Sequence, residues 1–332
     1  MRYLITGGSG YIGTRLIKAL EQQPNTERVL IADVQAPRAF PRMADYLALD
    51  VRDAGRLKLI VERERPDVVV HLAGLMHSGG DQRGMYETNV AGTGNVLEAI
   101  KNGGAHVVVL SSAAAYGPAR GKVSGLDEEA PLASAQDFEY GRHAVTADRL
   151  CQLWAARHTD RMISIVRSSL VLGPTVDNPI VKLWTDAPFH ARFADPDDSL
   201  QLVHEDDLVA ALLMLIERRD GGVFNVAGEG TVLLRECAEL TGLKQRRVPR
   251  AFYSKVARQG KSLQGLGFIK RPPVVATTRL RARTGWCPSY TSRETFEIAI
   301  QAQGRLVGAP KTTPIAEASL EAATDLHHPS AR

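Results

Sequence analysis

The chain has 332 residues, 44% of them hydrophobic and 23% charged, a composition typical of globular proteins that excludes a fibrous or wholly disordered chain. Its formal net charge of +4 and its 6% of aromatic residues are too small to indicate nucleic-acid binding. The three cysteines, Cys151, Cys237 and Cys287, form no Cys-x-x-Cys pair and no cluster with histidine. The sequence therefore predicts neither a disulfide framework nor a metal site.

Membrane and secretion signals are the next class to consider. No apolar stretch approaches the length needed to span a bilayer, and the first residues have no basic region or cleavage site typical of a secretory leader. We therefore expect a cytoplasmic protein without membrane contact, whose cysteines are reduced and mostly serve packing.

Short, β-branched segments alternate with amphipathic helical stretches through the first half of the chain. The predicted strands are Tyr3–Thr6, Val29–Asp33, Tyr46–Asp50, Val68–Ala73, Val107–Ser111 and Ile163–Ser168. Such alternation predicts a parallel sheet with helices on both faces, closed by right-handed crossovers into a doubly wound α/β (Rossmann) fold. Ligands of this fold bind at the carboxyl ends of the strands, so functional residues are expected just after strands.

The regular alternation ends after Pro174. The segment Val176–Ser199 is rich in Pro and Asp, and beyond it two further helices are predicted, near Glu205–Arg218 and Leu233–Thr241. From Gly308 onward the composition of Ala, Pro, Thr, Ser and His cannot offset the entropy of ordering. We predict a dinucleotide-binding domain over 1–174, a smaller substrate lobe over 175–307 interleaved with the last strands of the sheet, and a flexible tail over 308–332.

A glycine-rich loop follows the first predicted strand and leads into an amphipathic helix. It reads Thr6-Gly7-Gly8-Ser9-Gly10-Tyr11-Ile12-Gly13. Gly7 permits a tight turn, Gly10 lets the backbone approach a pyrophosphate, and Gly13 allows close packing of helix on strand. The free N–H groups at the start of the helix, around Tyr11 and Ile12, would face the phosphate charge.

An acidic residue completes this pattern. Asp33 ends the second predicted strand, 20 residues after Gly13, where a carboxylate can accept both hydroxyls of the adenosine ribose. Strand, loop, helix and carboxylate together predict a dinucleotide site. Because the carboxylate repels a 2′-phosphate, NAD is favoured over NADP, although Arg38 lies close enough in sequence to weaken this preference.

The ends of the next two predicted strands supply further candidate contacts. Asp50 would receive the adenine amino group while Val51 flanks the ring. The run Leu72-Ala73-Gly74 would line the phosphate and ribose side of the cofactor. His71, directly before that run, is either a cofactor contact or a core histidine at the end of a strand.

Several motifs, far apart in the chain, form a set. They are the spacing G-x-x-G-x-x-G, the pair Asp50-Val51, the run His71-Leu72-Ala73, Asn89 within Thr88-Asn89-Val90-Ala91-Gly92-Thr93, Ser111-Ser112-Ala113-Ala114-Ala115-Tyr116-Gly117, Val203-His204-Glu205-Asp206-Asp207-Leu208 and Gly222-Val223-Phe224-Asn225-Val226-Ala227-Gly228. The set resembles the extended short-chain dehydrogenase/reductase family, the NAD-dependent epimerase/dehydratase group, over about Met1 to Ile300. The resemblance implies that Asn89 and Ser111 also belong to the cofactor site. It further implies a homodimer formed through the helices near Asn89–Lys101 and Tyr140–His158.

The resemblance also implies a catalytic set of Ser or Thr, Tyr and Lys, the last two as Tyr-x-x-x-Lys on one helix. Ser112 falls on the Ser position, and Tyr140 falls on the Tyr position. Tyr would act as acid and base toward a substrate hydroxyl or carbonyl, and Ser would fix that oxygen. Lys would lower the pKa of the Tyr and hold the nicotinamide ribose, but this chain has Ala144 there.

The missing lysine leaves three alternatives. Without the cation, the pKa of Tyr140 is expected near its ordinary value of about 10, so the usual route should be slow at neutral pH. Ala144 could be a laboratory substitution, His143 could take over, or the protein could bind the cofactor without turnover. His143 is otherwise a surface or packing histidine.

The substrate signals are mixed. The arginine that family members using nucleotide sugars carry before the Val203 motif is missing, and Leu170 stands where Asn is common. By contrast, the segment from Thr241 to Thr284 has twelve basic residues and no acidic one. They are Lys244, Arg246, Arg247, Arg250, Lys255, Arg258, Lys261, Lys270, Arg271, Arg279, Arg281 and Arg283. This segment is either a solvated basic face or a wall that attracts an anionic substrate.

These observations favour an NAD-dependent oxidoreductase or epimerase-type enzyme. It would act on a secondary alcohol or ketone of a polar, anionic small molecule, sugar-like or nucleotide-linked. The alternatives are a non-catalytic NAD(P)-binding sensor and a non-redox isomerase or lyase with structural NAD.

Overall fold

A computed structural model describes residues 1–77, 79–118, 125–134, 138–185, 190–192, 198–242, 245–247, 272–304 and 306–307. The predicted tail over 308–332 lies outside the described residues. Within them, no helix combines the length and the apolar character that crossing a membrane requires.

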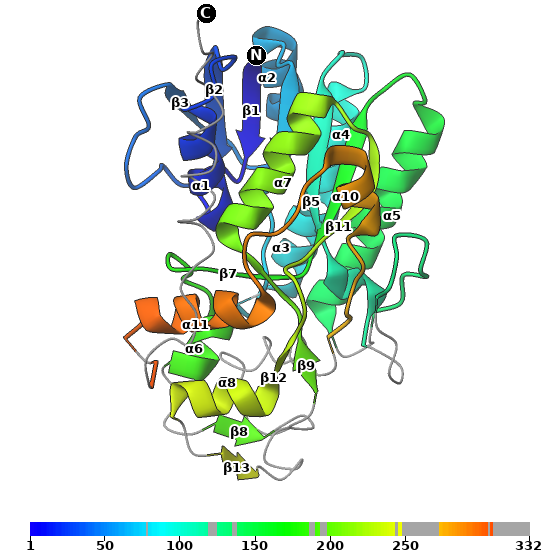
Figure 1. The fold of residues 1–332 in the computed structure, drawn as a ribbon. Coiled ribbons are helices and arrows are strands. Elements are labelled where there is room, and N and C mark those ends of the chain that lie inside the picture. The colour runs from blue at the N-terminus through cyan, green and yellow to red at the C-terminus, as the bar shows by residue number, and fades with distance from the viewer. Residues whose placement is uncertain are drawn as a thin grey trace, which may run out of the picture.

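Seven strands form one parallel sheet in the order β11-β6-β5-β4-β1-β2-β3 (Figure 1). Their bounds are β1 Arg2–Thr6, β2 Arg28–Asp33, β3 Ala44–Ala48, β4 Val68–His71, β5 His106–Ser112, β6 Ile163–Ser168 and β11 Gly222–Val226. Ile5 of β1 pairs with Ile31 of β2 on one side and with Val70 of β4 on the other. The strand order reverses between β1 and β4, which is where doubly wound sheets bind their ligands. The predicted Rossmann fold is confirmed.

Helices cover both faces of the sheet. They are α1 Tyr11–Leu20, α2 Ala54–Glu64, α3 Gln82–Tyr86, the π-helix η1 Glu87–Ala91, α4 Gly92–Ile100, the 3-10 helix η2 Ala113–Tyr116, α5 Glu139–Arg157 and α7 Glu205–Arg218. Successive side chains of a strand point to opposite faces, so Leu4 packs with α2, α4 and α5 while Ile5 packs with α1 and α7. Each face thus has its own apolar core.

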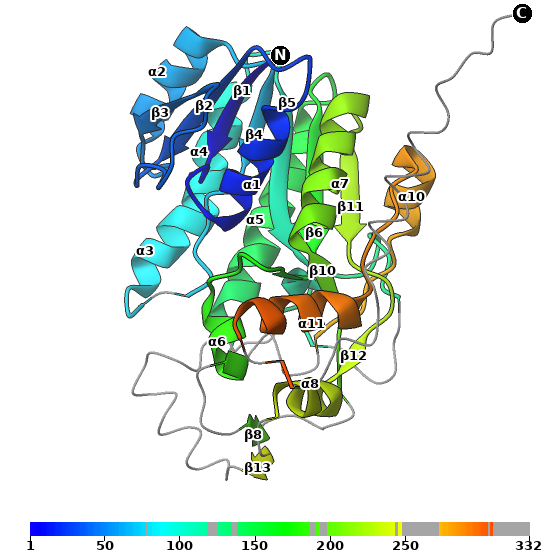
Figure 2. The same cartoon turned by 60° about the vertical axis from the view of Figure 1, so that its left-hand side comes forward.

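The remaining elements gather beyond the carboxyl ends of the strands (Figures 1 and 2). They are β7 Leu170–Leu172, α6 Pro179–Thr185, β8 His190–Arg192, β9 Ser199–Leu200, β10 Leu202–His204, β12 Val232–Leu233, α8 Leu234–Thr241, β13 Gln245–Arg247, α10 Thr278–Thr284 and α11 Ser292–Ala302. α10 is an exception, because it lies beside β11 and α7. The core of the lobe includes an edge contact between the rings of Trp184 and Phe296, whose centroids are 5.3 Å apart.

The third and fourth strands end earlier than the sequence indicates. β3 ends at Ala48 rather than Asp50 because Asp50 begins a turn, in which its backbone oxygen accepts a bond from the N–H of Asp53. β4 ends at His71 rather than Ala73, because the backbone of Leu72 and Ala73 packs against Gly7 of the glycine loop. The helix at Glu205–Arg218 has the predicted bounds.

Candidate cofactor and active site

The turn between β1 and α1 has the backbone that the glycine pattern predicts. Gly7 has φ of +71°, and a Cβ there would lie 2.5 Å from the backbone nitrogen of Ala73. A Cβ on Gly13 would lie 2.6 Å from the carbonyl oxygen of Gly7. The turn therefore packs closely against the segment after β4 and against α1. A side chain at Gly7 or Gly13 would occupy space that neighbouring backbone atoms already fill.

Gly10 has a different environment from these two glycines. A Cβ there would meet one atom, the carbonyl oxygen of Gly7 at 3.1 Å, and Gly10 is exposed at the start of α1. No side chain caps this helix, so the amides of its first turn, beginning at Tyr11 and Ile12, are available to an anion. The loop therefore fits a pyrophosphate.

Asp33 is fixed at the end of β2 beside the glycine loop. Its Oδ2 accepts a 3.0 Å bond from the N–H of Ser9, and its Oδ1 accepts a 3.1 Å bond from the N–H of Gln35. The first bond ties the carboxylate to the loop, so the carboxylate and the helix start would contact one ligand. This position fits an adenosine ribose next to a pyrophosphate.

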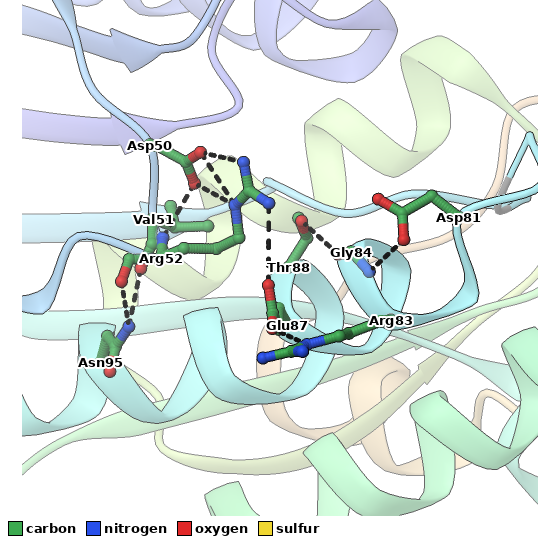
Figure 3. A network of polar contacts seen from close by, with 9 residues as sticks. All are labelled: Asp50, Val51, Arg52, Asp81, Arg83, Gly84, Glu87, Thr88 and Asn95. Atoms are coloured by element: carbon green, nitrogen blue, oxygen red, sulfur yellow. Dashed lines mark hydrogen bonds and ion pairs between the residues drawn. The ribbon is translucent and has the colours of Figure 1, made fainter.

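The turn after β3 places Asp50 against Arg52 (Figure 3). Nε of Arg52 lies 3.0 Å from Oδ1 and 2.9 Å from Oδ2 of Asp50, and the N–H of Arg52 donates to Oδ1 at 2.9 Å. These bonds lower the pKa of Asp50. Val51 is buried and packs against α4. A Cβ on Gly92 of that helix would lie 2.7 Å from Cγ2 of Val51.

The same turn is joined to the helices that follow β4 (Figure 3). Nδ2 of Asn95 donates to the backbone oxygen of Val51 at 2.9 Å, and the guanidinium of Arg52 lies 3.8 Å from Glu87. Glu87 also pairs with Arg83, at 2.7 Å. The turn that carries the predicted adenine contacts, Asp50 and Val51, is thus held in place by contacts with α3, η1 and α4.

Asn89 holds the segment that follows β4. Its side-chain amide donates to the backbone oxygen of Leu75 at 2.8 Å and accepts from the N–H of Leu75 at 2.7 Å. Asn89 lies in the π-helix η1, a rare element that is frequent at functional sites. The run Leu72-Ala73-Gly74 is consequently fixed at both ends, by the glycine loop and by Asn89.

His71 is a buried core histidine. Its Nδ1 lies 2.7 Å from the hydroxyl of Thr6, and its Nε2 lies 3.0 Å from the hydroxyl of Thr93. Burial lowers its pKa to about 4, so the ring is neutral at physiological pH. Both ring nitrogens have protein partners, which supports the core alternative over a cofactor contact.

The structure brings Ser112 and Tyr140 together. Ser112 ends β5, Tyr140 lies in the first turn of α5, and the side chain of Ser112 is near enough to the phenol to lower its pKa by hydrogen bonding. Burial of the phenol raises the pKa of Tyr140, and the bond to Ser112 offsets this in part. Ala144, one turn later, packs against an apolar cluster that includes Ala113 and Tyr116. A methyl group thus occupies the position of the family's lysine.

His143 lies three residues after Tyr140 in α5, on a neighbouring position of the helix surface. It is buried, and its ring contacts Tyr86 of α3 edge-on, with centroids 5.5 Å apart. Burial lowers its pKa, and its Nδ1 has no hydrogen-bond partner among the described residues. A catalytic role for His143 stays a prediction.

The sequence did not predict a buried ion pair between α5 and β6. Arg167 of β6 donates to the two carboxylate oxygens of Asp148 at 2.9 and 2.7 Å, and both side chains are buried. The hydroxyl of Ser111 donates to the same carboxylate at 2.7 Å, and Arg167 also donates to the hydroxyl of Tyr116 at 2.8 Å. The available signal was an arginine inside a strand predicted to be buried, since buried arginines require a partner.

The described part of the basic segment is paired. Arg279 contacts Glu129 at 2.7 Å, Arg283 contacts Asp220 at 2.6 Å, and Arg281 contacts Glu229. The side chains of the other nine basic residues of this segment lie outside the described residues. Over the part of the chain that the structure describes, no cluster of His, Cys, Asp and Glu is arranged to hold a metal ion.

Comparison with known proteins gives one family. The family model described as "NAD dependent epimerase/dehydratase family" matches residues 3–227. An uncharacterized protein of Mycobacterium tuberculosis (strain ATCC 25618 / H37Rv) is 25% identical over 323 residues, which cover 91% of this chain and 84% of the relative. A second uncharacterized protein of that strain is 30% identical over 320 residues, covering 94% of this chain and 31% of the longer relative.

Solved structures agree on the fold. The dTDP-glucose 4,6-dehydratase of Bacillus anthracis in complex with NAD has a TM-score of 0.73 and 19% identity, covering 92% of this chain and 96% of that one. The UDP-glucose 4-epimerase of Thermotoga maritima with UDP-glucose has a TM-score of 0.72 and 20% identity, covering 91% and 98%. The chain therefore belongs to the NAD-dependent epimerase/dehydratase family of extended short-chain dehydrogenases/reductases, and its cofactor is NAD.

Proposed function

We propose that the protein acts on a secondary alcohol or ketone of a polar, anionic small molecule, sugar-like or nucleotide-linked. Tyr140 is its acid and base, and Ser112 orients the reacting oxygen. The observation that carries this proposal is the approach of the Ser112 side chain at the end of β5 to the phenol of Tyr140 in α5, whose pKa it lowers. The pair belongs to the carboxyl end of β5, the edge of the sheet at which this fold binds its cofactor.

The chain's own groups have separable roles. The amides of Tyr11 and Ile12 hold the pyrophosphate, Asp33 holds the adenosine ribose, and Asp50 with Val51 receives the adenine. Leu72, Ala73 and Gly74, fixed by Asn89, line the phosphate and ribose side. NAD supplies a hydride acceptor when bound. Tyr140 takes the proton of the substrate hydroxyl, or returns it to a carbonyl, while Ser112 donates a hydrogen bond to that oxygen.

Ala144 limits how well Tyr140 performs this task. A buried phenol without a neighbouring cation from position 144 stays protonated at neutral pH, so it donates a proton more readily than it accepts one. The methyl group packed at position 144 also favours a second candidate function, an NAD-binding protein without turnover. Activity should therefore be low at neutral pH.

The support for the substrate class comes from structural neighbours. Structural neighbours include MoeE5 in complex with UDP-glucuronic acid and NAD, at a TM-score of 0.73, and the epimerase with UDP-glucose. In this chain the described arginines of α10 are neutralised by carboxylates, so they leave no free positive charge for an anionic substrate.

We also infer a cytoplasmic homodimer that pairs through α4 and α5. These helices pack on each other, and Leu153 of α5 is 56% exposed. Sedimentation of the protein and of Leu153→Arg tests this inference. We expect a dimer for the first and a monomer for the second.

The experiment for the catalytic proposal compares the protein with Ala144→Lys, in assays of reduced nicotinamide formation with panels of nucleotide sugars and hydroxy acids. We expect the lysine to raise the rate at neutral pH by about 100-fold, within the range that general acid–base catalysis contributes. Ala156→Lys is the matched control, because it adds the same charge at an exposed position of α5.

Two results would overturn the catalytic proposal. The first is Ala144→Lys without turnover of any substrate despite bound NAD. The second is conversion of a substrate by the unmodified chain in which Tyr140→Phe has no effect.

A further inference from the structure

A buried carboxylate at the start of α7 joins the cofactor helix to the substrate lobe. Glu205 is the first residue of α7, and its side chain has no exposed surface. Nη1 of Arg15 lies 2.7 Å from its Oε1, and the hydroxyl of Tyr11 donates to its Oε2. Both partners belong to α1, which lies against α7 on the same face of the sheet.

A third segment completes the cluster. The hydroxyl of Thr175 lies 3.1 Å from Oε1 and 3.0 Å from Oε2 of Glu205, and it accepts a 3.2 Å bond from Arg15. A Cβ on Gly173 would lie 2.3 Å from Cδ of Glu205, so only glycine leaves room for the carboxylate there. The backbone at Gly173 thus packs directly against the carboxylate of Glu205.

Two of these contacts reach the pyrophosphate end of the cofactor site. Tyr11 is the first residue of α1 and directly follows Gly10, so its own N–H is one of the amides that face the phosphates. Arg15 lies one turn further along the same helix. Burial and the neighbouring carboxylate raise the pKa of Tyr11, so its hydroxyl remains a donor to Glu205 at every physiological pH.

We propose that Glu205 is a positioning residue of the NAD site, which fixes the first turn of α1 against the start of the substrate lobe through Tyr11, Arg15 and Thr175. The inference rests on the binding of NAD at the glycine loop. A helix start that is held in place before the ligand arrives binds it more tightly, because less order has to be imposed on binding.

Arg15 pairs with two carboxylates, those of Glu205 and Asp206, so loss of the arginine and loss of the Glu205 charge should have different effects. Arg15 balances the charge of Glu205, which would otherwise repel a nearby pyrophosphate. Arg15→Met should therefore weaken NAD binding. Glu205→Gln keeps the shape and a hydrogen-bond acceptor while it removes the negative charge, so it should bind NAD as tightly as the unmodified chain.

The test is calorimetric titration of NAD and, by ligand-observed NMR, of adenosine into the full-length protein and its variants. We expect Glu205→Ala to weaken NAD binding by about tenfold, the effect of losing one good hydrogen bond to a charged group. Adenosine lacks the pyrophosphate and reaches only the Asp33 and Asp50 end, so its affinity should not change.

The matched control is Glu297→Ala, which removes another buried carboxylate of the lobe. Glu297 pairs with Arg293 at 2.9 Å within α11. Its loss should lower the unfolding temperature and leave the affinity for NAD unchanged. All affinities are measured well below each variant's unfolding temperature.

The proposal fails if Glu205→Ala binds NAD as tightly as the unmodified chain, or if it weakens adenosine as much as NAD. The first result would make the cluster purely structural, and the second would indicate a general distortion of the domain. Because the readout is affinity, either result leaves the catalytic proposal for Tyr140 intact. Absence of turnover in Ala144→Lys would likewise leave the role of Glu205 intact.

Discussion

The side chain of Ser112 at the end of β5 lies near the phenol of Tyr140 in the first turn of α5 and lowers the pKa of that phenol. Ala144, one turn further along α5, contributes a methyl group to an apolar cluster. In the proposed catalytic assignment, the chain keeps two of the three groups of the Ser, Tyr and Lys set. The ionisation of Tyr140 is the property most changed by the loss of the third.

The first prediction concerns pH. Because burial raises the pKa of Tyr140, its phenolate forms only above the ordinary tyrosine range, and any activity that needs the phenolate should rise with pH. Ala144→Lys should move this rise to lower pH. The measurement is the difference in tyrosinate absorbance between each protein and its Tyr140→Phe counterpart during a pH titration. An unchanged titration in Ala144→Lys would contradict the assigned geometry.

The second prediction separates two glycines of the loop. Gly13→Ala places a Cβ 2.6 Å from the carbonyl oxygen of Gly7, so it should destabilise the protein by about 1 to 3 kcal/mol. Gly10→Ala meets one atom at 3.1 Å and should stay within about 1 kcal/mol of the unmodified stability while weakening NAD binding. Urea unfolding and NAD titration of both variants provide the check. Equal losses of stability would show that Gly10 serves packing instead.

The third prediction concerns the buried pair of Asp148 and Arg167. Asp148→Ala leaves a buried guanidinium without its carboxylate, which should cost about 3 to 5 kcal/mol in the free energy of unfolding. The double variant Asp148→Leu/Arg167→Met removes both charges and should lose much less. The measurement is the free energy of unfolding of the two variants in denaturant. A double variant as unstable as the single one would mean that the charges are not coupled.

The fourth prediction concerns acid stability. His71 and His106 are buried, and burial lowers the pKa of each to about 4. Between about pH 6.5 and 4 the unfolded chain binds protons that the fold excludes, so stability falls as pH falls through this range and is constant above it. Each histidine should account for about 2 kcal/mol of loss at pH 5. Urea unfolding at pH 7 and pH 5 should show a smaller difference for His71→Asn, and an equal difference would refute this assignment.

The fold and the cofactor loop were predictable because their signals are local. The glycine spacing and Asp33 lie within one strand, helix and strand unit, and apolar runs mark β1, β5 and β6 directly. Strand ends were less accurate. β3 stops two residues early because the turn at Asp50 is stabilised by Arg52, a side-chain interaction that hydrophobic patterning does not register.

The contacts that the sequence did not reveal all join distant segments. Glu205 meets Tyr11, and Asp148 meets Arg167, only after the sheet and its helices have assembled. The same limit applies to the basic segment, where Arg283 of α10 is neutralised by Asp220 of another part of the chain. Charge counted along a sequence cannot show such pairing.

The most direct test of the whole account is calorimetric titration of NAD and of NADP into the unmodified protein. With Asp33 tied to the glycine loop, NAD should bind at one site, at least about tenfold more tightly than NADP, because the carboxylate repels the 2′-phosphate. Folded protein that binds neither dinucleotide, or that prefers NADP, would contradict the cofactor site on which every other proposal depends.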